Sequence, residues 1–260
     1  MNRKLAIVLA AGKGTRMKSD LPKVLIEVRG RPMIEYVLDA LAAAGVDEIL
    51  LVVGYRADDV RKALGRRLSS SRPRLRFVQQ AEQLGTGHAV MVCREALAGH
   101  AGPVLIVAGD SPLTQADSLR TLLAEFDRSQ PACLLGTAHK ENPHGLGRVV
   151  RDGQGEFLAI VEERDATEEQ RRITEVNMSC YVFACPDLLF ALDQLRPANV
   201  QAEYYLTDCP GALKAAGRVV EAQAVLKPIE TLSINTREEL AAVETALGGC
   251  LGADSPKPAN

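Results

Sequence analysis

The sequence predicts an α/β fold, a Rossmann-like, mainly parallel, twisted sheet flanked by helices, with a smaller mixed β portion built onto it. Three observations predict this class. Short runs rich in Val, Ile and Leu recur without period-two alternation, which is typical of strands buried on both faces. Over the first 135 residues amphipathic helical patterns separate these runs, an alternation that favours a parallel sheet. After Pro143, strand patterns follow one another without regular helices between them.

The first half contains five strand patterns and four helical patterns. The clearest helix spans Met33 to Ala44, with an apolar stripe every three or four residues and Gly45 as its stop. The strands are expected at Leu5–Ala10, Glu48–Val53, Arg76–Val78, Val104–Ala108 and Ala132–Gly136. The other helices are expected at Asp58–Leu68, His88–Leu97 and Gln115–Phe126.

The second half is shorter and mixed. Strands are expected at Gly147–Arg151, Glu156–Val161 and Val176–Phe183, and helices at Asp187–Leu195 and Thr236–Ala246. We interpret residues 1–250 as a single domain, in which about 1–135 bind a nucleotide and about 136–235 bind a second substrate. Residues 251–260 are rich in Gly, Pro and Ser and are expected to form a disordered tail.

Composition excludes several classes of protein. The 31 Lys and Arg against 33 Asp and Glu give a net charge of −2, so no global basic field attracts nucleic acid or an anionic membrane. The longest apolar run, Leu5 to Ala11, is far below the roughly 20 residues that span a bilayer. The six cysteines form no C-x-x-C pair and are expected to be reduced and mostly buried. These features favour a cytoplasmic protein.

The strongest motif follows the first strand, where Ala11-Gly12-Lys13-Gly14-Thr15-Arg16-Met17 leads to Asp20-Leu21-Pro22-Lys23. Glycines let backbone N–H groups turn toward a phosphate, and Arg16 and Lys23 supply positive charge. The motif is not a Walker A loop, and Met17 stands where a dinucleotide fingerprint needs its third glycine. The alternative is a glycine-rich turn beside a solvated basic stretch.

A polar loop, Gln79 to His88, follows another strand and leads into a helix. A glutamine amide donates and accepts hydrogen bonds at once, which suits the edge of a nucleobase. Because carboxyl ends of parallel strands are where α/β sheets bind ligands, this loop and the glycine loop are expected to lie together. A solvated loop is the alternative, and His88 is interpreted as an ordinary residue at the start of a helix.

Asp110 follows the apolar strand Val104–Ala108 directly. A carboxylate there, next to a phosphate site, is placed to hold Mg²⁺. The alternative is a helix cap or a turn aspartate, since Pro112 could start a helix. Asn235 puts an amide oxygen just before a helix, and taken alone it is interpreted as a cap.

These residues resemble the sugar-nucleotide pyrophosphorylase family, and most closely the uridylyltransferase domain of the bacterial bifunctional N-acetylglucosamine-1-phosphate uridylyltransferase / glucosamine-1-phosphate acetyltransferase. The resemblance covers about Leu5 to Leu240 and keeps its motifs in order. The matching strings are L-A-A-G-K-G-T-R-M-x-S-D-L-P-K, Q-A-E-Q-L-G-T-G-H-A, G-D-x-P-L, N-P-x-G-x-G-R, I-V-E-E-x-D-A-T-x-E-Q-R, E-Y-Y-L-T-D and the late N-x-R.

The resemblance implies a nucleotide-diphospho-sugar transferase fold and assigns residues to three groups. Nucleotide binding falls to Leu9, Ala10, Ala11, Gly12, Gly14, Thr15, Gln80, Gly85 and Thr86, with Arg16 and Lys23 as catalytic residues on the triphosphate. Asp110 and Asn235 are implied as the two protein ligands of Mg²⁺. The sugar is implied to contact Gly147, Glu162, Asn177, Tyr205 and Thr207.

The implied reaction transfers a uridylyl group from UTP to a sugar 1-phosphate, giving UDP-sugar and pyrophosphate. N-acetylglucosamine 1-phosphate is the expected acceptor and Mg²⁺ the expected cofactor, and no protein nucleophile is needed. Another sugar 1-phosphate such as glucose 1-phosphate is the main alternative. A molybdopterin or phosphocholine acceptor is disfavoured by Glu162, Asn177 and the E-Y-Y-L-T-D string. A non-catalytic sensor is disfavoured by the intact phosphate and metal residues. The choice of UTP over dTTP and the oligomeric state are left open.

Several positions depart from the family pattern. Asn177-Met178-Ser179 stands where N-T-G is usual, and Ala108 replaces the usual tyrosine before Gly109-Asp110. His144 and Ala202 replace the common threonine and glycine. The catalytic set is thus expected to be intact and the sugar pocket altered. The sequence stops where the acetyltransferase β-helix of the family would begin, so that activity and its trimeric assembly are not expected, whether the chain is stand-alone or truncated.

Overall fold

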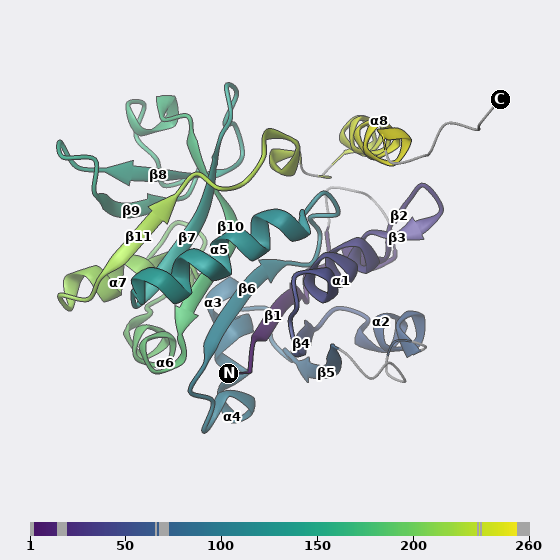
Figure 1. Cartoon of the computed structure of the whole chain (residues 1–260), viewed down its shortest axis with the longest axis horizontal. Coiled ribbons are helices and arrows are strands. Elements are labelled where there is room, and N and C mark those ends of the chain that lie inside the picture. Colours follow the sequence, from purple (N-terminus) through teal and green to yellow (C-terminus); the bar gives the residue numbers. More distant parts are fainter. Residues whose placement is uncertain are drawn as a thin grey trace.

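A nine-stranded sheet forms the centre of the computed structural model, which describes residues 3–14, 20–65, 67, 73–232, 234 and 236–253. Seven strands follow the order β11-β7-β10-β6-β1-β4-β5, and β8 and β9 branch from β10 (Figure 1). The strands are β1 (Leu5–Ala10), β4 (Glu48–Val53), β5 (Arg74–Gln79), β6 (Pro103–Ala108), β7 (Cys133–His139), β8 (Gly147–Arg151), β9 (Phe157–Val161), β10 (Glu175–Ala184) and β11 (Val220–Gln223).

The sheet is mixed, and its first-half strands form the parallel part that the sequence predicts. Strands β5, β4, β1 and β6 run parallel in register, and β11 is parallel to β7. Strand β10 is antiparallel to both β6 and β7, and it also pairs antiparallel with β8. The predicted mixed portion is therefore attached through β10, which brings the second half of the chain to the centre of the sheet.

Helices cover both faces of the sheet. On one face lie α1 (Met33–Ala43), α2 (Ala57–Ala63) and α5 (Ala116–Ser129), and on the other α3 (Thr86–Met91), α4 (Arg94–Leu97), α6 (Cys185–Gln194) and α7 (Asp208–Ala215). Along β1, Ala6 and Val8 join the first cluster while Leu5 and Ile7 join the second. Burial of both faces explains why these strands show no alternation, since each fully buried Leu or Ile side chain contributes about 1.5–3 kcal/mol.

A third, smaller cluster packs α8 (Arg237–Ala253) against β2 (Glu27–Val28) and the start of α1. Strand β2 pairs with β3 (Arg31–Pro32), and short 3-10 helices span Lys23–Leu25, Gln170–Arg172 and Pro228–Thr231. The helix expected to end at Ala246 continues to Ala253, so it includes three residues of the segment expected to be a disordered tail. Residues 254–260 lie outside the described part of the chain.

Several element boundaries differ from the sequence prediction. The helix expected over His88–Leu97 is two helices, α3 and α4, and the helix expected to reach Leu68 ends at Ala63. The edge strand β5 is longer than predicted. Its arginines point to solvent and interrupt the apolar run, so the run predicted only the central part of the strand. Helix α7 was not predicted, since Pro210 is unfavourable inside helices but is tolerated in their first turn.

The described cysteines are buried and free, as predicted: Cys93, Cys133, Cys180, Cys185 and Cys209. Burial raises the pKa of the Cys93 thiol to about 12 and also raises the pKa values of the other four. Thiols with raised pKa values are poor nucleophiles. These cysteines therefore act as packing residues.

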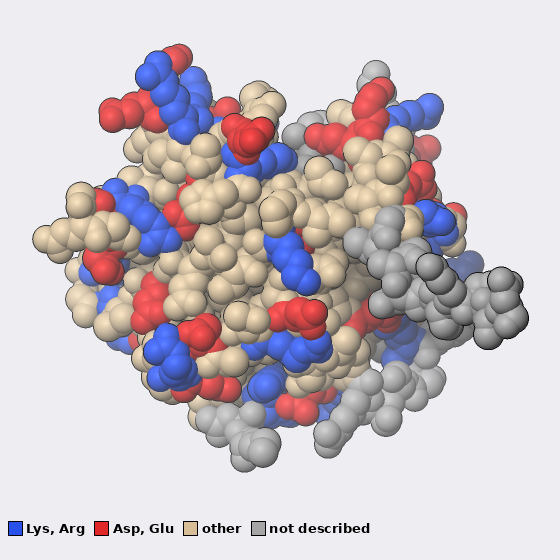
Figure 2. Space-filling model, turned by 45° about the horizontal axis from the view of Figure 1, so that its top comes forward, with Lys and Arg blue, Asp and Glu red and all other residues tan. Residues whose placement is uncertain are grey.

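Charges of both signs are interspersed on the face of the molecule that Figure 2 shows, around a broad area of uncharged residues. This mixture agrees with the net charge of −2. In the part of the chain that the structure describes, every helix is too short or too polar to span a bilayer.

Two residues that replace a family glycine have left-handed backbone conformations, namely Ser179 with φ of 52° and Ala202 with φ of 51°. Ser179 lies where β10 shifts register against β7, between Asn177 and Cys180. In this conformation a Cβ atom crowds the backbone, which glycine avoids. The fold therefore holds Ser179 in a strained conformation.

We expect Ser179→Gly to raise the free energy of unfolding by about 1 kcal/mol, because it removes the left-handed penalty of a residue with a Cβ. Urea unfolding followed by circular dichroism measures the change. Ser179→Ala is the matched control, since it keeps the Cβ and should show no such gain. Equal stabilities of the glycine and alanine variants would contradict the assignment of strain.

Candidate functional site

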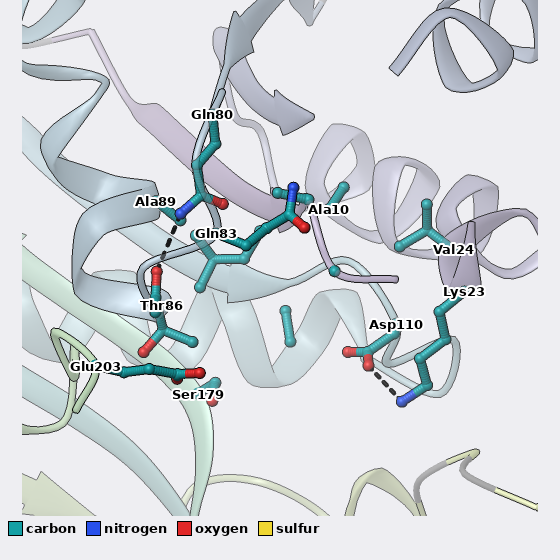
Figure 3. A pocket seen from close by; sticks show the side chains of 15 residues that line it. Ala10, Lys23, Val24, Gln80, Gln83, Thr86, Ala89, Asp110, Ser179 and Glu203 are labelled. Carbon is teal, nitrogen blue, oxygen red and sulfur yellow. Dashed lines mark hydrogen bonds and ion pairs between the residues drawn. The ribbon is translucent and has the colours of Figure 1, made fainter. Parts of the chain in front are cut away.

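A cavity of about 410 Å³ opens at the carboxyl ends of β1, β5 and β6 (Figure 3). This is the edge where open α/β sheets bind ligands. Of the residues predicted from the sequence, Leu9, Ala10, Ala11, Gly12, Lys23, Gln80, Gly85, Thr86 and Asp110 line it. The structure therefore brings the glycine loop, the glutamine loop and the aspartate after β6 to one place, as predicted.

The floor of the cavity is backbone held by neighbouring strand ends. The N–H of Gly109 donates to the carbonyl of Leu9 at 2.9 Å, and the N–H of Tyr55 donates to the carbonyl of Ala11 at 3.1 Å. A Cβ on Gly109 would lie 2.9 Å from that Leu9 oxygen, so only glycine fits there. These contacts fix the path of the chain between β1 and the glycine loop.

Gln80 is almost fully buried at one end of the cavity. Its Nε2 donates to the carbonyl of Gly85 at 3.2 Å and lies 3.1 Å from Nδ1 of His88. When Nδ1 of His88 is the unprotonated ring nitrogen, both amide protons have acceptors on the protein side, which leaves the carbonyl oxygen Oε1 as the group available to a ligand. Gln80 is arranged to accept a hydrogen bond from a ligand N–H.

Lys23 and Asp110 lie at the other end of the cavity from Gln80 (Figure 3). The Lys23 Nζ is 2.6 Å from Oδ2 of Asp110. A Cβ on Gly14 would lie 2.6 Å from the Cβ of Lys23, so the glycine loop packs directly on the lysine stem. Helix α5 begins at Ala116 with Gln115 as its cap, which excludes the alternative of Asp110 as that cap. The charged end of the cavity is suited to phosphate groups and a cation.

Segment 203–207 closes another side of the cavity. The N–H of Gly87 donates to the carbonyl of Tyr204 at 2.7 Å, and the N–H of Tyr204 donates to the carbonyl of Leu84 at 2.8 Å. The N–H of Leu206 donates to Oγ1 of Thr86 at 3.0 Å. A Cβ on Gly85 would lie 2.5 Å from the Tyr204 oxygen. The E-Y-Y-L-T-D string is thereby bound along the glutamine loop.

The residues predicted to bind a sugar form a second, mostly buried group beside the cavity. Gly147 pairs with Asn177 across β8 and β10, and a Cβ on Gly147 would lie 3.5 Å from Oε1 of Glu162. Thr207 hydrogen-bonds to Glu162, and the hydroxyl of Tyr205 accepts a hydrogen bond from Gln201 at 2.7 Å. None of the five lines the cavity itself, but Ser179 and Glu203 do, and each is two residues from one of the five.

Three residues that were not predicted as site residues connect the two groups, and all of them line the cavity: Gln83, Ser179 and Glu203. Ser179 is two residues from Asn177 on β10, and Glu203 is two residues from Tyr205. Gln83 and Glu203 belong to motifs that were noted in the sequence. Their membership of a motif is the signal that could have identified them as site residues. Ser179 was noted only as a departure from the family pattern.

Burial raises the pKa of Glu162 above its ordinary value of 4.5, and this effect exceeds the opposing hydrogen bond from Thr207. The neighbouring carboxylates of Asp165 and Asp208 raise it further. The pKa of Asp208 is raised as well, by burial and then by Asp165. The protein therefore holds Glu162 in a place that disfavours its charge, as functional carboxylates often are.

Thr15, Arg16 and Asn235 lie outside the described residues, so their roles stay predictions. Among the residues that the structure describes, no group of three or more His, Cys, Asp and Glu could hold a metal ion. Mg²⁺ does not require such a group, because it keeps several waters and takes one or two carboxylates together with substrate phosphates. The carboxylate of Asp110, on the cavity wall, fits that donor set.

An open α/β sheet with a ligand cavity at the carboxyl ends of its parallel strands defines a nucleotide-binding α/β protein. The chain belongs to the family of the MobA-like NTP transferase domain, which matches residues 6–206. It is accordingly a member of a nucleotidyltransferase family.

Two curated relatives match nearly the whole chain. It is 44% identical over 242 residues to the bifunctional protein GlmU of Pelotomaculum thermopropionicum, covering 93% of this chain and 51% of the relative. It is 43% identical over 247 residues to the bifunctional protein GlmU of Heliobacterium modesticaldum, covering 95% and 52%. The chain spans about half the length of the curated relatives it matches.

Two solved structures share the fold. A UDP-glucose pyrophosphorylase complexed with UDP-glucose matches with a TM-score of 0.75 and 19% identity, covering 96% of this chain and 100% of that chain. A putative glucose-1-phosphate thymidylyltransferase from Bacillus anthracis matches with a TM-score of 0.77 and 17% identity, covering 98% of both chains. The predicted fold class is confirmed.

The raised pKa of Glu162 predicts how this residue couples stability to pH. The folded state holds its proton more tightly than the unfolded chain does, so the stabilisation is full below the unfolded pKa and is lost as the pH rises through the folded pKa. We expect the free energy of unfolding of the wild type, minus that of Glu162→Gln, to fall as the pH rises from about 4 to about 8. Urea unfolding of both proteins at each pH measures this difference. A difference that rises with pH would show that the folded state favours the carboxylate.

Proposed function

We propose that this protein transfers a uridylyl group from UTP to N-acetylglucosamine 1-phosphate, releasing pyrophosphate. The observation that carries the proposal is the arrangement of one cavity, with Gln80 at one end and Lys23 and Asp110 at the other, beside the buried group of Gly147, Glu162 and Asn177. The family resemblance and the identity of 44% to a bifunctional protein GlmU support the choice of substrates.

The orientation of Gln80 supports a uracil base. Its free Oε1 needs a donor on the ligand, and the N3–H of uracil or thymine supplies one. The corresponding nitrogen of cytosine is an acceptor, as is N1 of adenine, so CTP and ATP would place two acceptors against each other. Guanine offers an N–H but brings a larger, two-ring base. We therefore expect UTP and dTTP to bind better than the other triphosphates.

The reaction needs positioning and charge neutralisation rather than a protein nucleophile. A phosphate oxygen of the sugar 1-phosphate attacks the α-phosphorus of UTP in line, and a new P–O bond forms. The bond from the α-phosphorus to the oxygen that bridges to the β-phosphorus breaks, and pyrophosphate leaves with that electron pair. Lys23, at the charged end of the cavity, neutralises phosphate charge as it develops. Arg16 is proposed to do the same.

We propose Asp110 and Asn235 as the residues that hold Mg²⁺. When bound, Mg²⁺ supplies Lewis-acid stabilisation of the charge on the reacting phosphates. In this structure the Asp110 carboxylate forms an ion pair with the Lys23 amine. Binding of a cation by Asp110 would free the lysine amine for the phosphates, so one carboxylate serves both as a partner for the lysine and as a metal ligand.

The second group of residues is proposed to bind the sugar. The carboxylate of Glu162 accepts hydrogen bonds from hydroxyl groups, and the amide of Asn177 both donates and accepts them. The Asn177 Oδ1 already accepts the N–H of Ser179 at 3.1 Å, so the substrate would meet the amide nitrogen, which also faces the buried Tyr181 hydroxyl. A Cβ on Gly147 would lie 3.1 Å from Cγ2 of Ile160 and in van der Waals contact with Glu162 and Asn177, so the glycine keeps this edge of the sugar-binding group clear.

The proposal is tested with a matrix of nucleoside triphosphates against sugar 1-phosphates, read by pyrophosphate release. UTP with N-acetylglucosamine 1-phosphate should give the highest kcat/KM, and CTP and ATP should give little turnover. A clear preference for glucose 1-phosphate would overturn the sugar assignment and leave the reaction class standing. Absence of turnover with every pair, while UTP still binds, would favour the non-catalytic sensor.

We expect Asp110→Asn to keep the fold and to lower kcat about 10²- to 10³-fold, the usual cost of removing one electrostatic element of a transition state. Stability should change by no more than about 1 kcal/mol, because the ion pair with Lys23 is partly exposed. Pyrophosphate release across Mg²⁺ concentrations and thermal melting measure the two effects, and added Mg²⁺ should recover part of the rate.

Asp193→Asn is the matched control, because Asp193 also loses an ion pair with a basic side chain, Arg94, but lies outside the cavity. It should leave kcat unchanged. If Asp110→Asn turns over at the wild-type rate, Asp110 is a turn residue and not a metal ligand.

A further inference from the structure

Arg148 is a charged residue buried inside the mixed portion of the fold, with only 2% of its side chain exposed. Its Nη2 donates to Oε2 of Glu163 at 2.7 Å, and its Nη1 donates to the carbonyl of Leu146. The carbonyl of Arg171 accepts from both Nε and Nη2 at 3.4 Å. A guanidinium out of water requires partners of this kind, since an unpaired buried charge is very costly.

Glu163 has two roles in this cluster. Besides the arginine, its Oε2 accepts the N–H of Gly145 at 3.1 Å. Burial alone would raise the pKa of Glu163, but the bonds from Arg148 and from the Gly145 N–H outweigh it and lower the pKa. The carboxylate is therefore charged at neutral pH, and it ties the loop before β8 to the segment after β9.

Arg148 and Glu163 each lie one residue along the chain from a residue proposed to bind the sugar. Arg148 follows Gly147, and Glu163 follows Glu162. Across the sheet Arg148 is opposite Val176, the neighbour of Asn177, and also opposite Val161, the neighbour of Glu162. The Arg148–Glu163 pair thus fixes the backbone on both sides of the sugar-binding group without belonging to it.

We propose that Arg148 and Glu163 are positioning residues, which set the spacing of Gly147, Glu162 and Asn177 and thereby the affinity for the sugar phosphate. This inference rests on the proposed function. The pair acts on only one of the two substrates, because its contacts lie in the mixed portion and none of them reaches the cavity residues around Gln80.

A second arginine–glutamate pair, whose arginine also lies on β8, offers a matched control. The Nε and Nη2 of Arg151 donate to the two carboxylate oxygens of Glu175 at 2.6 and 2.7 Å, and Thr137 also donates to Glu175 at 2.6 Å. This pair joins β8 to β10, whereas the first joins β8 to the segment after β9, and its residues are not adjacent to Gly147, Glu162 or Asn177. Comparing variants of the two pairs distinguishes a local effect on the sugar-binding residues from a general loss of stability.

The test compares Glu163→Gln with Glu175→Gln in steady-state kinetics and thermal melting. Both variants should melt below the wild type. Only Glu163→Gln should raise KM for the sugar 1-phosphate, by about 10-fold, which is the lower end of what supporting residues usually contribute. Its KM for UTP should stay within about twofold of the wild type, since the nucleotide cavity is untouched. Glu163→Asp keeps the charge and should recover part of the loss.

Three other outcomes are possible, and each would contradict either the positioning role or the proposed function. If Glu163→Gln and Glu175→Gln change the two KM values alike, the pair only stabilises the fold and the positioning role is wrong. The role is also wrong if Glu163→Gln raises KM for UTP as much as KM for the sugar phosphate. If the wild type turns over no sugar 1-phosphate with any triphosphate, the proposed function fails, and this inference fails with it. If Glu163→Gln does not fold, Glu163→Asp replaces it in the test. Its KM values for the sugar 1-phosphate and for UTP are then compared in the same way.

Discussion

Three hydrogen bonds between residues 84–87 and 204–206 hold the two halves of the site at a fixed separation. They join a loop of the parallel sheet to a segment that follows α6, and the carbonyl of Tyr204 approaches so closely that Gly85 and Gly87 have no room for a side chain. Gly85 also has φ of 107°, a conformation that other residues rarely adopt. Two of these bonds are backbone on both sides, and the third is accepted by the Thr86 hydroxyl, so the junction fixes the relative position of the two segments. Everything that the cavity and the buried carboxylate group do together depends on it.

The charged residues of the site differ in how deeply they are buried. Lys23 and Asp110 neutralise one another at the open end, where solvent screens both and where exchange of partners costs little. Glu162 is held where its charge is disfavoured, and its neighbours Asp165 and Asp208 are of the same sign. Such a group is a local source of instability in the free protein. In the proposed sugar-binding role, hydroxyl groups of the ligand would donate hydrogen bonds to this carboxylate and offset part of that cost.

Sequence patterns predicted the elements whose burial is uniform, because a run such as Glu48–Val53 shows its environment in its composition. They were weaker where the environment is mixed: the arginines of β5 face solvent, and β11 has only four residues. The cavity side of the site could be predicted in part, since the glycine loop, the glutamine loop and Asp110 each follow a strand at the same edge of the sheet. The Lys23–Asp110 and Arg148–Glu163 pairs could not, because they join segments whose separation in space only the fold determines.

Strand β10 is the last of the central strands to be made, yet it lies in the middle of the sheet between β6 and β7. During synthesis, residues 109–174 must be added after β6 before β10 exists, which takes about 3 to 13 seconds at usual rates of translation. Over that interval the edge of β6 that later pairs with β10 has unpaired backbone N–H and C=O groups and is a template for unwanted association. The time for which the nascent half-sheet is exposed is therefore set by translation, and slower translation would lengthen it.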